Sequence, residues 1–327
     1  MEVLQSNRRG NWDDTFDARA SQGDKVATNL PIFSPHTISY IQQAIAQYSN
    51  IVAQGGWPVV PATKKLQLGV VDPDVAVLRK RLMISGDLST SAGMSEAFDT
   101  YVDAAVKRFQ ARHGLPVDGV LGKYSYAALN VSAQTRLGQL QTNLHRLQSM
   151  TPPSSRYVMV NIPAAQIEAV ENDRVALRHT AIVGKIDRQT PILNSAINEI
   201  IVNPYWNAPE SIVRKDIIPL MRKNPQYLAE NNIRILGPNG EIDPATIDWN
   251  TEDAAKFRFR QDPGKINAMA SVKINFPNQH ATYMHDTPQQ TLFDKLMRFD
   301  SSGCVRVQNV RDLVTWLLRD TPGWDRQ

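Results

Sequence analysis

The apolar residues of this 327-residue chain change their spacing once, at residues 151–155, and this change favours an α+β architecture. Before Thr151-Pro152-Pro153-Ser154-Ser155, apolar residues recur every three or four positions, as in amphipathic helices. After it, short Val- and Ile-rich runs are bounded by Pro, Gly or Asn, as in strands. The sequence therefore predicts a multi-domain α+β protein. We expect helices first, then a mostly antiparallel, sandwich-like sheet domain.

Two helical stripes surround a smaller unit in the N-terminal part. Apolar residues from Ile38 to Val52, and again within 133–149, predict two helices that pack on each other. The expected boundaries are a polar arm at 1–34, a helical scaffold at 35–71 and 132–155, an inserted unit at 72–131, a sheet domain at 156–320 and a tail at 321–327.

The inserted unit at 72–131 has the pattern of three short helices. Asp72-Pro73 is a typical helix start, and a second apolar stripe runs from Phe98 to Phe109. The glycine-containing segment 114–122 predicts a tight turn before a third helix near Tyr126. This unit is expected to be all-α.

The sheet domain contains a long insertion. Strands are predicted at 157–162, 174–183, 197–202, 272–276 and 281–284. Residues 209–265 interrupt them with a helical pattern that includes Ile212 and Leu220. Such a long connection is usually functional, so we interpret it as a helical lid with Tyr205 and Trp206 at its base.

The single cysteine, Cys304, is the strongest candidate for chemistry. An internal disulfide is excluded, and a thiol needs a base or a lowered pKa to act as a nucleophile. His285 ends a predicted strand, and a hairpin-like excursion would return Cys304 to its side. Ser302-Gly303 predicts a turn whose N–H groups form an oxyanion hole at the start of the final helix, where the helix dipole favours a thiolate.

The segment Ser302-Gly303-Cys304-Val305-Arg306-Val307, with Tyr283-x-His285 before it, resembles the active-site signature of L,D-transpeptidases. The resemblance covers roughly residues 156–320 and is greatest to the larger, lidded members. Ser302 stands where many members have His, and Asp286 where many have Gly. The lidded subfamily shares both variants.

This resemblance implies a role for each matching residue. Cys304 is the nucleophile, His285 the base and then the acid, and the backbone N–H groups of Gly303 and Cys304 hold the oxyanion. A backbone carbonyl, rather than the Asp286 side chain, orients the imidazole. The residues expected to bind or shape the substrate are Arg306, Tyr283, Ser302, Tyr205 and Trp206.

The inserted unit resembles a second family. Phe109-Gln110, Gly114-Leu115 and Val117-Asp118-Gly119 look like a three-helix peptidoglycan-binding domain. Its alternative is an ordinary helical scaffold that has lost ligand affinity. Two motifs that point to one polymer make peptidoglycan the expected partner.

Other functional classes find little support in the sequence. The formal net charge is +4, without a basic run typical of nucleic-acid binding. His and Cys lack metal-ligand spacing, so we expect neither a metal nor another cofactor. No apolar run is long enough for a transmembrane segment. The first residues do not resemble a signal peptide; we expect a periplasmic protein whose signal sequence is missing from this chain.

The function that the resemblance implies is formation of 3→3 peptidoglycan cross-links through a cysteine thioester. Water as acceptor would make the protein an L,D-carboxypeptidase, and other amines would give 1→3 links or protein attachment. A catalytically silent peptidoglycan-binding scaffold is the alternative from another class. Carbapenems are expected to acylate Cys304, because their strained carbonyl mimics the scissile one.

Overall fold

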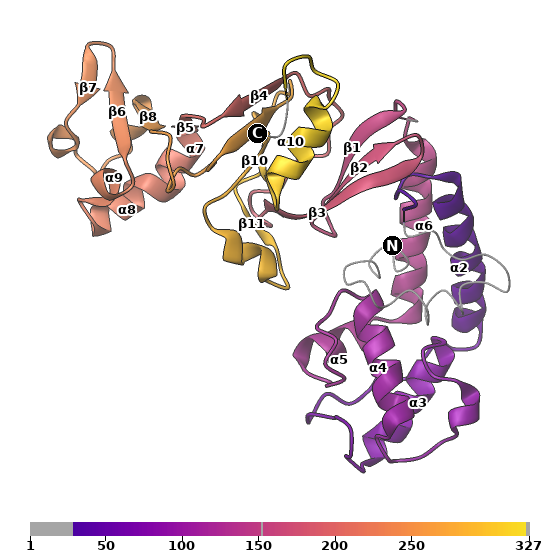
Figure 1. Cartoon of the computed structure of the whole chain (residues 1–327). Helices are drawn as coiled ribbons and strands as arrows, with labels where there is room; N and C mark the ends of the chain where they lie inside the picture. Colours follow the sequence, from indigo (N-terminus) through magenta and orange to yellow (C-terminus); the bar gives the residue numbers. More distant parts are fainter. Residues whose placement is uncertain (1–28, 152, 325–327) are drawn as a thin grey trace. The chain divides into compact units, whose positions relative to one another are not determined.

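The computed structural model describes residues 29–151 and 153–324 (Figure 1). Most of the expected arm and the last three residues of the expected tail lie outside the described residues. The chain divides into two compact units. The first holds the described residues up to Tyr157 together with Val170–Ala176, and the second holds Val158–Ala169 and the residues from Leu177 onwards.

Two long helices form the scaffold of the first unit. Helix α2 (Pro35–Ala53) and helix α6 (Ala133–Ser149) run side by side, as the sequence predicted (Figure 1). Each begins at a serine whose side chain accepts a hydrogen bond from a backbone N–H three residues later: Ser34 in α2 and Ser132 in α6. This is the usual way to satisfy the first unpaired N–H groups of a helix.

In the sequence, the three-helix unit lies between the two scaffold helices. It consists of α3 (Pro73–Ile84), α4 (Thr100–Arg112) and α5 (Lys123–Leu129), with a short 3₁₀ turn at Thr90–Ala92. The Gln110 side chain closes the turn between α4 and α5, because it donates to Asp118 Oδ1 at 2.8 Å and accepts from the Gly119 N–H at 2.9 Å. Phe98, Phe109 and Leu121 lie fully buried in its core.

The second unit is built on a sheet that has eight strands among the described residues. Its order is β1-β2-β3-β12-β10-β9-β4, and β11 also pairs with β3. Most neighbours are antiparallel, but β10 with β12 and β11 with β3 are parallel. Helix α10 (Val310–Leu318) packs its apolar residues into the core of this sheet. The strands are β1 (Arg156–Asn161), β2 (Gln166–Glu171), β3 (Arg174–Gly184), β4 (Glu199–Val202), β9 (Val272–Asn275), β10 (Met284–His285), β11 (Phe299–Ser301) and β12 (Val305–Val307).

The insertion after β4 contains strands as well as helices. It has its own core, in which Ile235 and Phe259 are fully buried. It also contains a four-stranded sheet in the order β5-β8-β6-β7. The sequence predicted its helices but missed this sheet, whose strands are only three to five residues long. The elements are β5 (Trp206–Ala208), α7 (Glu210–Ile212), the π-helical η3 (Val213–Ile217), α8 (Ile218–Lys223), α9 (Tyr227–Glu230), β6 (Ile233–Gly237), β7 (Gly240–Ile242), η4 (Pro244–Thr246), η5 (Asp253–Lys256) and β8 (Arg258–Gln261).

Membrane-spanning helices are not found in the described part of the chain, where every helix is too short or too polar to cross a bilayer.

Candidate active site

Strand β3 places the loop that carries the candidate nucleophile. Its end pairs with β11 before the loop and with β12 after it, so both sides of Ser302-Gly303-Cys304 are fixed. The Lys185 N–H adds a hydrogen bond to the Ser301 carbonyl at 2.9 Å. The cysteine is therefore held between two strands of the sheet.

A serine side chain sets the shape of the turn. Ser301 Oγ accepts from the Gly303 N–H at 3.2 Å and donates to the Cys304 carbonyl at 2.5 Å. Gly303 is buried and has φ +113°, a conformation that a residue with a Cβ rarely adopts. The predicted role of Ser301 as a turn residue agrees with these contacts.

Strand alternation brings His285 and Cys304 to one face. Parallel pairing sets Met284 opposite Val305 and His285 opposite Arg306. Met284 and Val305 both belong to the hydrophobic core, so the residue after Met284 and the residue before Val305 face the other side of the sheet. The sequence predicted a hairpin-like return of Cys304 to His285; in the structure the strands that flank these residues, β10 and β12, are adjacent and run parallel.

A backbone carbonyl orients the imidazole. His285 Nδ1 lies 2.5 Å from the carbonyl oxygen of Asp286, and a carbonyl can only accept. Nδ1 therefore carries the proton, and Nε2 is left as the basic nitrogen. The Asp286 carboxylate points to other groups: it accepts from the Ser271 hydroxyl at 2.5 Å and from the Thr287 N–H at 2.8 Å.

The candidate pair is electrically neutral at rest. Burial lowers the pKa of His285 to about 4, and the positive charges of Arg306 and Lys273 also lower it. Burial likewise raises the pKa of the Cys304 thiol, while hydrogen bonds with Tyr283 and the charges of Lys273 and Arg306 lower it in part. Near neutral pH these shifts leave a thiol and a neutral imidazole, which are an acid and a base in chemical terms.

Tyr283 lies beside the thiol, and Trp206 contacts the Tyr283 phenol. Burial and hydrogen bonding to Cys304 raise the pKa of the Tyr283 phenol, and a hydrogen bond with Trp206 opposes this shift. The Tyr283 ring also lies 5.5 Å from the His285 ring. Tyr205 has a different neighbour, since its half-exposed ring packs under the Arg260 guanidinium at 4.7 Å.

Arg306 and Ser302 occupy the rim of the site. Arg306, partly buried, donates to the Gln289 side chain at 3.1 Å. Ser302 is exposed, and its hydroxyl accepts from Arg188 at 3.0 Å. The same Arg188 guanidinium binds both carboxylate oxygens of Asp216 in η3, at 2.5 and 3.0 Å. Arg188 thus joins the insertion to the cysteine loop.

The expectation that Cys304 stands at the start of the final helix is wrong. Cys304 does not begin the final helix, because β12 intervenes and α10 starts only at Val310; a helix dipole cannot favour its thiolate. The Gly303 N–H is not free, because it donates to Ser301 Oγ. Among the described residues, the Cys304 N–H has no backbone acceptor.

Two residues near the site were missed by sequence reasoning. Lys273 pairs with His285 across β9 and β10, and its ammonium lies 4.4 Å from the centre of the Tyr283 ring. Its position in a predicted strand next to Tyr283-x-His285 was the available signal. Arg188 lies in the loop after β3, and nothing in its local sequence indicates a long-range ion pair.

No group of three or more His, Cys, Asp or Glu side chains that suits a metal ion occurs in the described ranges.

Comparison with known proteins gives matches to two domain families. A family model for the "L,D-transpeptidase catalytic domain" matches residues 155–324, more than half of the chain. A model for the "Putative peptidoglycan binding domain" matches residues 71–129. A Haemophilus influenzae protein named "Putative L,D-transpeptidase" is 37% identical over 188 residues. The matched stretch spans 57% of this chain and 38% of that relative.

Proposed function

Because the chain belongs to the L,D-transpeptidase family, we propose that it forms 3→3 cross-links in peptidoglycan through a thioester on Cys304. One observation carries the proposal most directly. A neutral histidine ends β10, the thiol directly precedes the adjacent parallel strand β12, and the histidine is held by its Nδ1 so that Nε2 is basic. This is the arrangement that general-base activation of a nucleophile requires.

The first half-reaction is acylation. His285 Nε2 takes the thiol proton as Cys304 Sγ attacks the carbonyl of the L-centre of diaminopimelate in a tetrapeptide stem. The oxyanion that forms is near the Cys304 N–H, and Lys273 and Arg306 add positive charge. The C–N bond to the terminal D-Ala then breaks. The imidazolium returns its proton to the leaving amine, and a thioester remains.

The second half-reaction uses an amine as acceptor. The side-chain amine of a second stem attacks the thioester, His285 receives its proton, and Sγ leaves to regain that proton. The thioester conserves the free energy of the cleaved amide, so no nucleotide is needed. Water must be kept away from it, and we assign this task to the insertion, which Arg188 ties to the cysteine loop.

The substrate suggests where the protein works. Mature peptidoglycan lies outside the cytoplasmic membrane, so we propose a periplasmic location and a contribution to cell-wall organisation and cell shape. The matched peptidoglycan-binding domain supports a cell-envelope role. Carbapenems should acylate Cys304 by the same first step, since their ring opening follows attack by the same nucleophile.

Product analysis tests the proposal and separates its competitors. The protein is incubated with a purified disaccharide-tetrapeptide, and the products are resolved by chromatography and mass spectrometry. A 3→3 dimer made by the wild type and absent with Cys304→Ala supports the transpeptidase. If the wild type released tripeptide and made no dimer, the function would be that of an L,D-carboxypeptidase. Absence of turnover together with absence of a carbapenem adduct would favour a binding scaffold.

A further inference from the structure

Three charged or titratable side chains form one row across the sheet of the second unit. His285 of β10 pairs with Lys273 of β9 on one side and with Arg306 of β12 on the other. Residues paired in this way project to the same face of the sheet, and neighbouring strands lie about 4.8 Å apart. The imidazole of the candidate base therefore stands between an ammonium and a guanidinium.

Lys273 carries a charge that no acid of the described residues neutralises. Its ammonium lies 4.4 Å from the centre of the Tyr283 ring, and the Tyr283 hydroxyl is hydrogen-bonded to Cys304. In the part of the chain that the structure describes, this ammonium has neither an ion-pair partner nor a hydrogen-bond acceptor, although a lysine offers three N–H donors. A cation with available donors thus lies beside the aromatic ring that contacts the nucleophile.

Arg306, on the other side of the imidazole, has one neutral partner. It donates from Nη1 to Gln289 at 3.1 Å, while Nε and Nη2 have no hydrogen-bond partner among the described residues. Burial lowers the pKa of Arg306, and the charge of Asp300 opposes this shift. The Asp300 carboxylate nevertheless binds another cation, 3.4 Å away at Lys295 Nζ. The guanidinium therefore keeps donors for an acceptor that the described residues do not provide.

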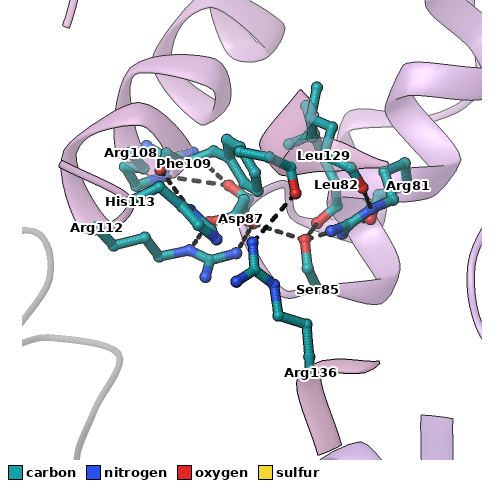
Figure 2. A network of polar contacts seen from close by, with 11 residues as sticks. Arg81, Leu82, Ser85, Asp87, Arg108, Phe109, Arg112, His113, Leu129 and Arg136 are labelled. Carbon is teal, nitrogen blue, oxygen red and sulfur yellow. Dashed lines mark hydrogen bonds and ion pairs between the residues drawn. The ribbon is translucent and has the colours of Figure 1, made fainter. Parts of the chain in front are cut away.

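A buried arginine of the first unit shows the structural alternative. In Figure 2, Arg112 binds both carboxylate oxygens of Asp87, at 2.8 and 2.6 Å. Both side chains are buried, and the carboxylate compensates the charge, as is usual for buried ions. Lys273 and Arg306 have no such carboxylate among the described residues, which is the condition expected of cations that bind an anionic ligand.

The proposed reaction places a carboxylate next to this row. His285 Nε2 must return its proton to the leaving amine, so the amine nitrogen comes within hydrogen-bond reach, about 3 Å, of the imidazole. In the donor this nitrogen belongs to the terminal D-Ala, whose free carboxylate is separated from it by a single carbon. The carboxylate therefore lies a few ångströms from His285, where a cation stands on either side.

The acceptor has the same chemistry at the same place. The attacking amine must give its proton to His285 Nε2, so it takes the position that the leaving amine has vacated. In diaminopimelate this amine is bonded to the D-centre, which also carries a free carboxylate. The leaving group and the acceptor are thus both D-amino acid units with a carboxylate one carbon from the reacting nitrogen, and one anion site can serve both.

We propose that Lys273 and Arg306 form a subsite for the carboxylate on the amine side of the reacting bond. It holds the carboxylate of the terminal D-Ala in the first half-reaction and that of the acceptor's D-centre in the second. Ammonium and guanidinium groups bind carboxylates through charge-assisted hydrogen bonds, which are among the strong ones. The identity of the ligand rests on the proposed function, whereas the unpaired cations are a property of the site itself.

Binding without turnover tests the subsite first. The full chain carrying Cys304→Ala is titrated with a disaccharide-tetrapeptide, and with the same muropeptide whose terminal carboxylate is an amide. Hydrogen–deuterium exchange is followed in peptides covering 272–307. Amidation should raise the half-protecting concentration on the order of tenfold, the usual effect of losing a charged hydrogen bond. Adding Lys273→Met should weaken the acid to the level of the amide. Equal affinities for acid and amide in Cys304→Ala would overturn the subsite.

The rate of acylation separates a carboxylate subsite from a general electrostatic effect. At about pH 8, above the ordinary pKa of histidine, the imidazole is neutral in every variant. Lys273→Met should slow the single-turnover reaction of the free-acid donor about tenfold relative to that of the amide, so that the preference for the acid disappears. Lys273→Arg should retain the preference. If Lys273 acted only on the oxyanion or the imidazole, both donors would slow equally; an unchanged ratio contradicts the proposal.

Two further variants control for structure and net charge. Arg306→Gln should lower the acid-to-amide ratio in the same direction as Lys273→Met, and its thermal midpoint is measured because Arg306 also bonds Gln289. Lys265→Met removes an exposed lysine charge between β8 and β9 and should keep the wild-type ratio. A change in Lys265→Met as large as that in Lys273→Met would be an effect of net charge, and the subsite would be wrong.

Acceptors distinguish the two sources of the carboxylate. A disaccharide-tripeptide, which has no D-Ala to lose, is offered with its D-centre carboxylate free or amidated, together with an isotope-labelled tetrapeptide donor. Amidation should lower the yield of mixed dimer severalfold with the wild type and not with Lys273→Met. An effect confined to the donor or to the acceptor would overturn the shared use of the subsite, and an effect on neither would overturn the subsite itself.

The subsite and the proposed function fail separately. Thioester and dimer formation without any preference for the free acid would keep the transpeptidase and remove the subsite. A preference for the free acid in binding that depends on Lys273, without a thioester in the wild type, would keep the subsite and remove the catalytic proposal.

Discussion

His285 Nδ1 and the backbone carbonyl oxygen of Asp286 lie 2.5 Å apart, which fixes the tautomer and the orientation of the imidazole. His285 is only 7% exposed, so few other groups compete for its ring nitrogens. This carbonyl holds the imidazole in one tautomer and orientation, as a carboxylate does in serine triads. The position of that carbonyl is in turn set by the Asp286 side chain, which binds Ser271 and Thr287.

Asp286→Ala should therefore slow acylation without weakening substrate binding. Loss of the carboxylate releases the peptide whose carbonyl holds His285, and misplacement by about 1 Å costs about 100-fold. We expect kcat to fall by about 10- to 100-fold with KM nearly unchanged. Asp286→Asn keeps one oxygen acceptor and should recover part of the rate. A wild-type kcat in Asp286→Ala would show that the side chain has no positioning role.

The pH dependence of acylation should have its acid limb near pH 4. The pKa of His285 is lowered to about 4, so the imidazole stays neutral above that pH and loses its basicity below it. An ordinary histidine would give a limb near pH ~6.5. Lys273→Met removes a charge that lowers this pKa, so the limb should move to higher pH. The rate of adduct formation in a single turnover, measured across pH, tests both predictions. An acid limb at the same pH in Lys273→Met and in the wild type would contradict the electrostatic account.

Breaking the ion pair between Arg188 and Asp216 should favour hydrolysis. The pair connects η3 of the insertion to the loop that carries Cys304, and Asp216→Asn removes its charge. We expect the ratio of tripeptide to dimer to rise severalfold, because water reaches the thioester more often. Glu252→Gln removes an acid whose partner, Arg214, lies within the insertion, and is the matched control. Equal product ratios in the wild type and both variants would show that the Arg188–Asp216 ion pair does not keep water from the thioester.

Gly303→Ala should destabilise the cysteine loop. Its φ of +113° is strained for any residue with a Cβ, while the nearest atom to that Cβ would be 3.5 Å away. Backbone strain alone predicts a loss of about 1–3 kcal/mol in the free energy of unfolding. Gly138→Ala, in a helix with open space around it, should change stability in the opposite direction. Urea titration measures both, and a neutral Gly303→Ala would mean that the loop adopts another conformation.

The sequence predicted the elements that have a strong period. The stripes at 38–52 and 133–149 match α2 and α6, because a helix that packs on one face must repeat its apolar residues every three or four positions. Strand β2, with the sequence Gln166–Glu171, was missed since it does not alternate clearly between apolar and polar residues, and five of its six residues are buried.

The chemistry at the candidate site was less accessible to sequence reasoning. Cys304 and His285 stand out by residue type and motif. The contributions of Lys273 and Arg188 depend on which strands pair and on how the insertion folds back, and these are long-range properties. The error about the helix dipole has the same origin. β12 is only three residues long, so the pattern gave no sign that a strand separates Cys304 from α10.

Intact-protein mass spectrometry after mixing with a disaccharide-tetrapeptide tests the central claim most directly. Wild type, quenched in acid early in the reaction, should carry one adduct equal in mass to the donor without its terminal D-Ala, and fragmentation should place it on Cys304. His285→Gln should acquire the adduct much more slowly, and Cys304→Ala should acquire none. An adduct of this mass on Cys304→Ala, or turnover by that variant, would contradict a thioester mechanism at Cys304.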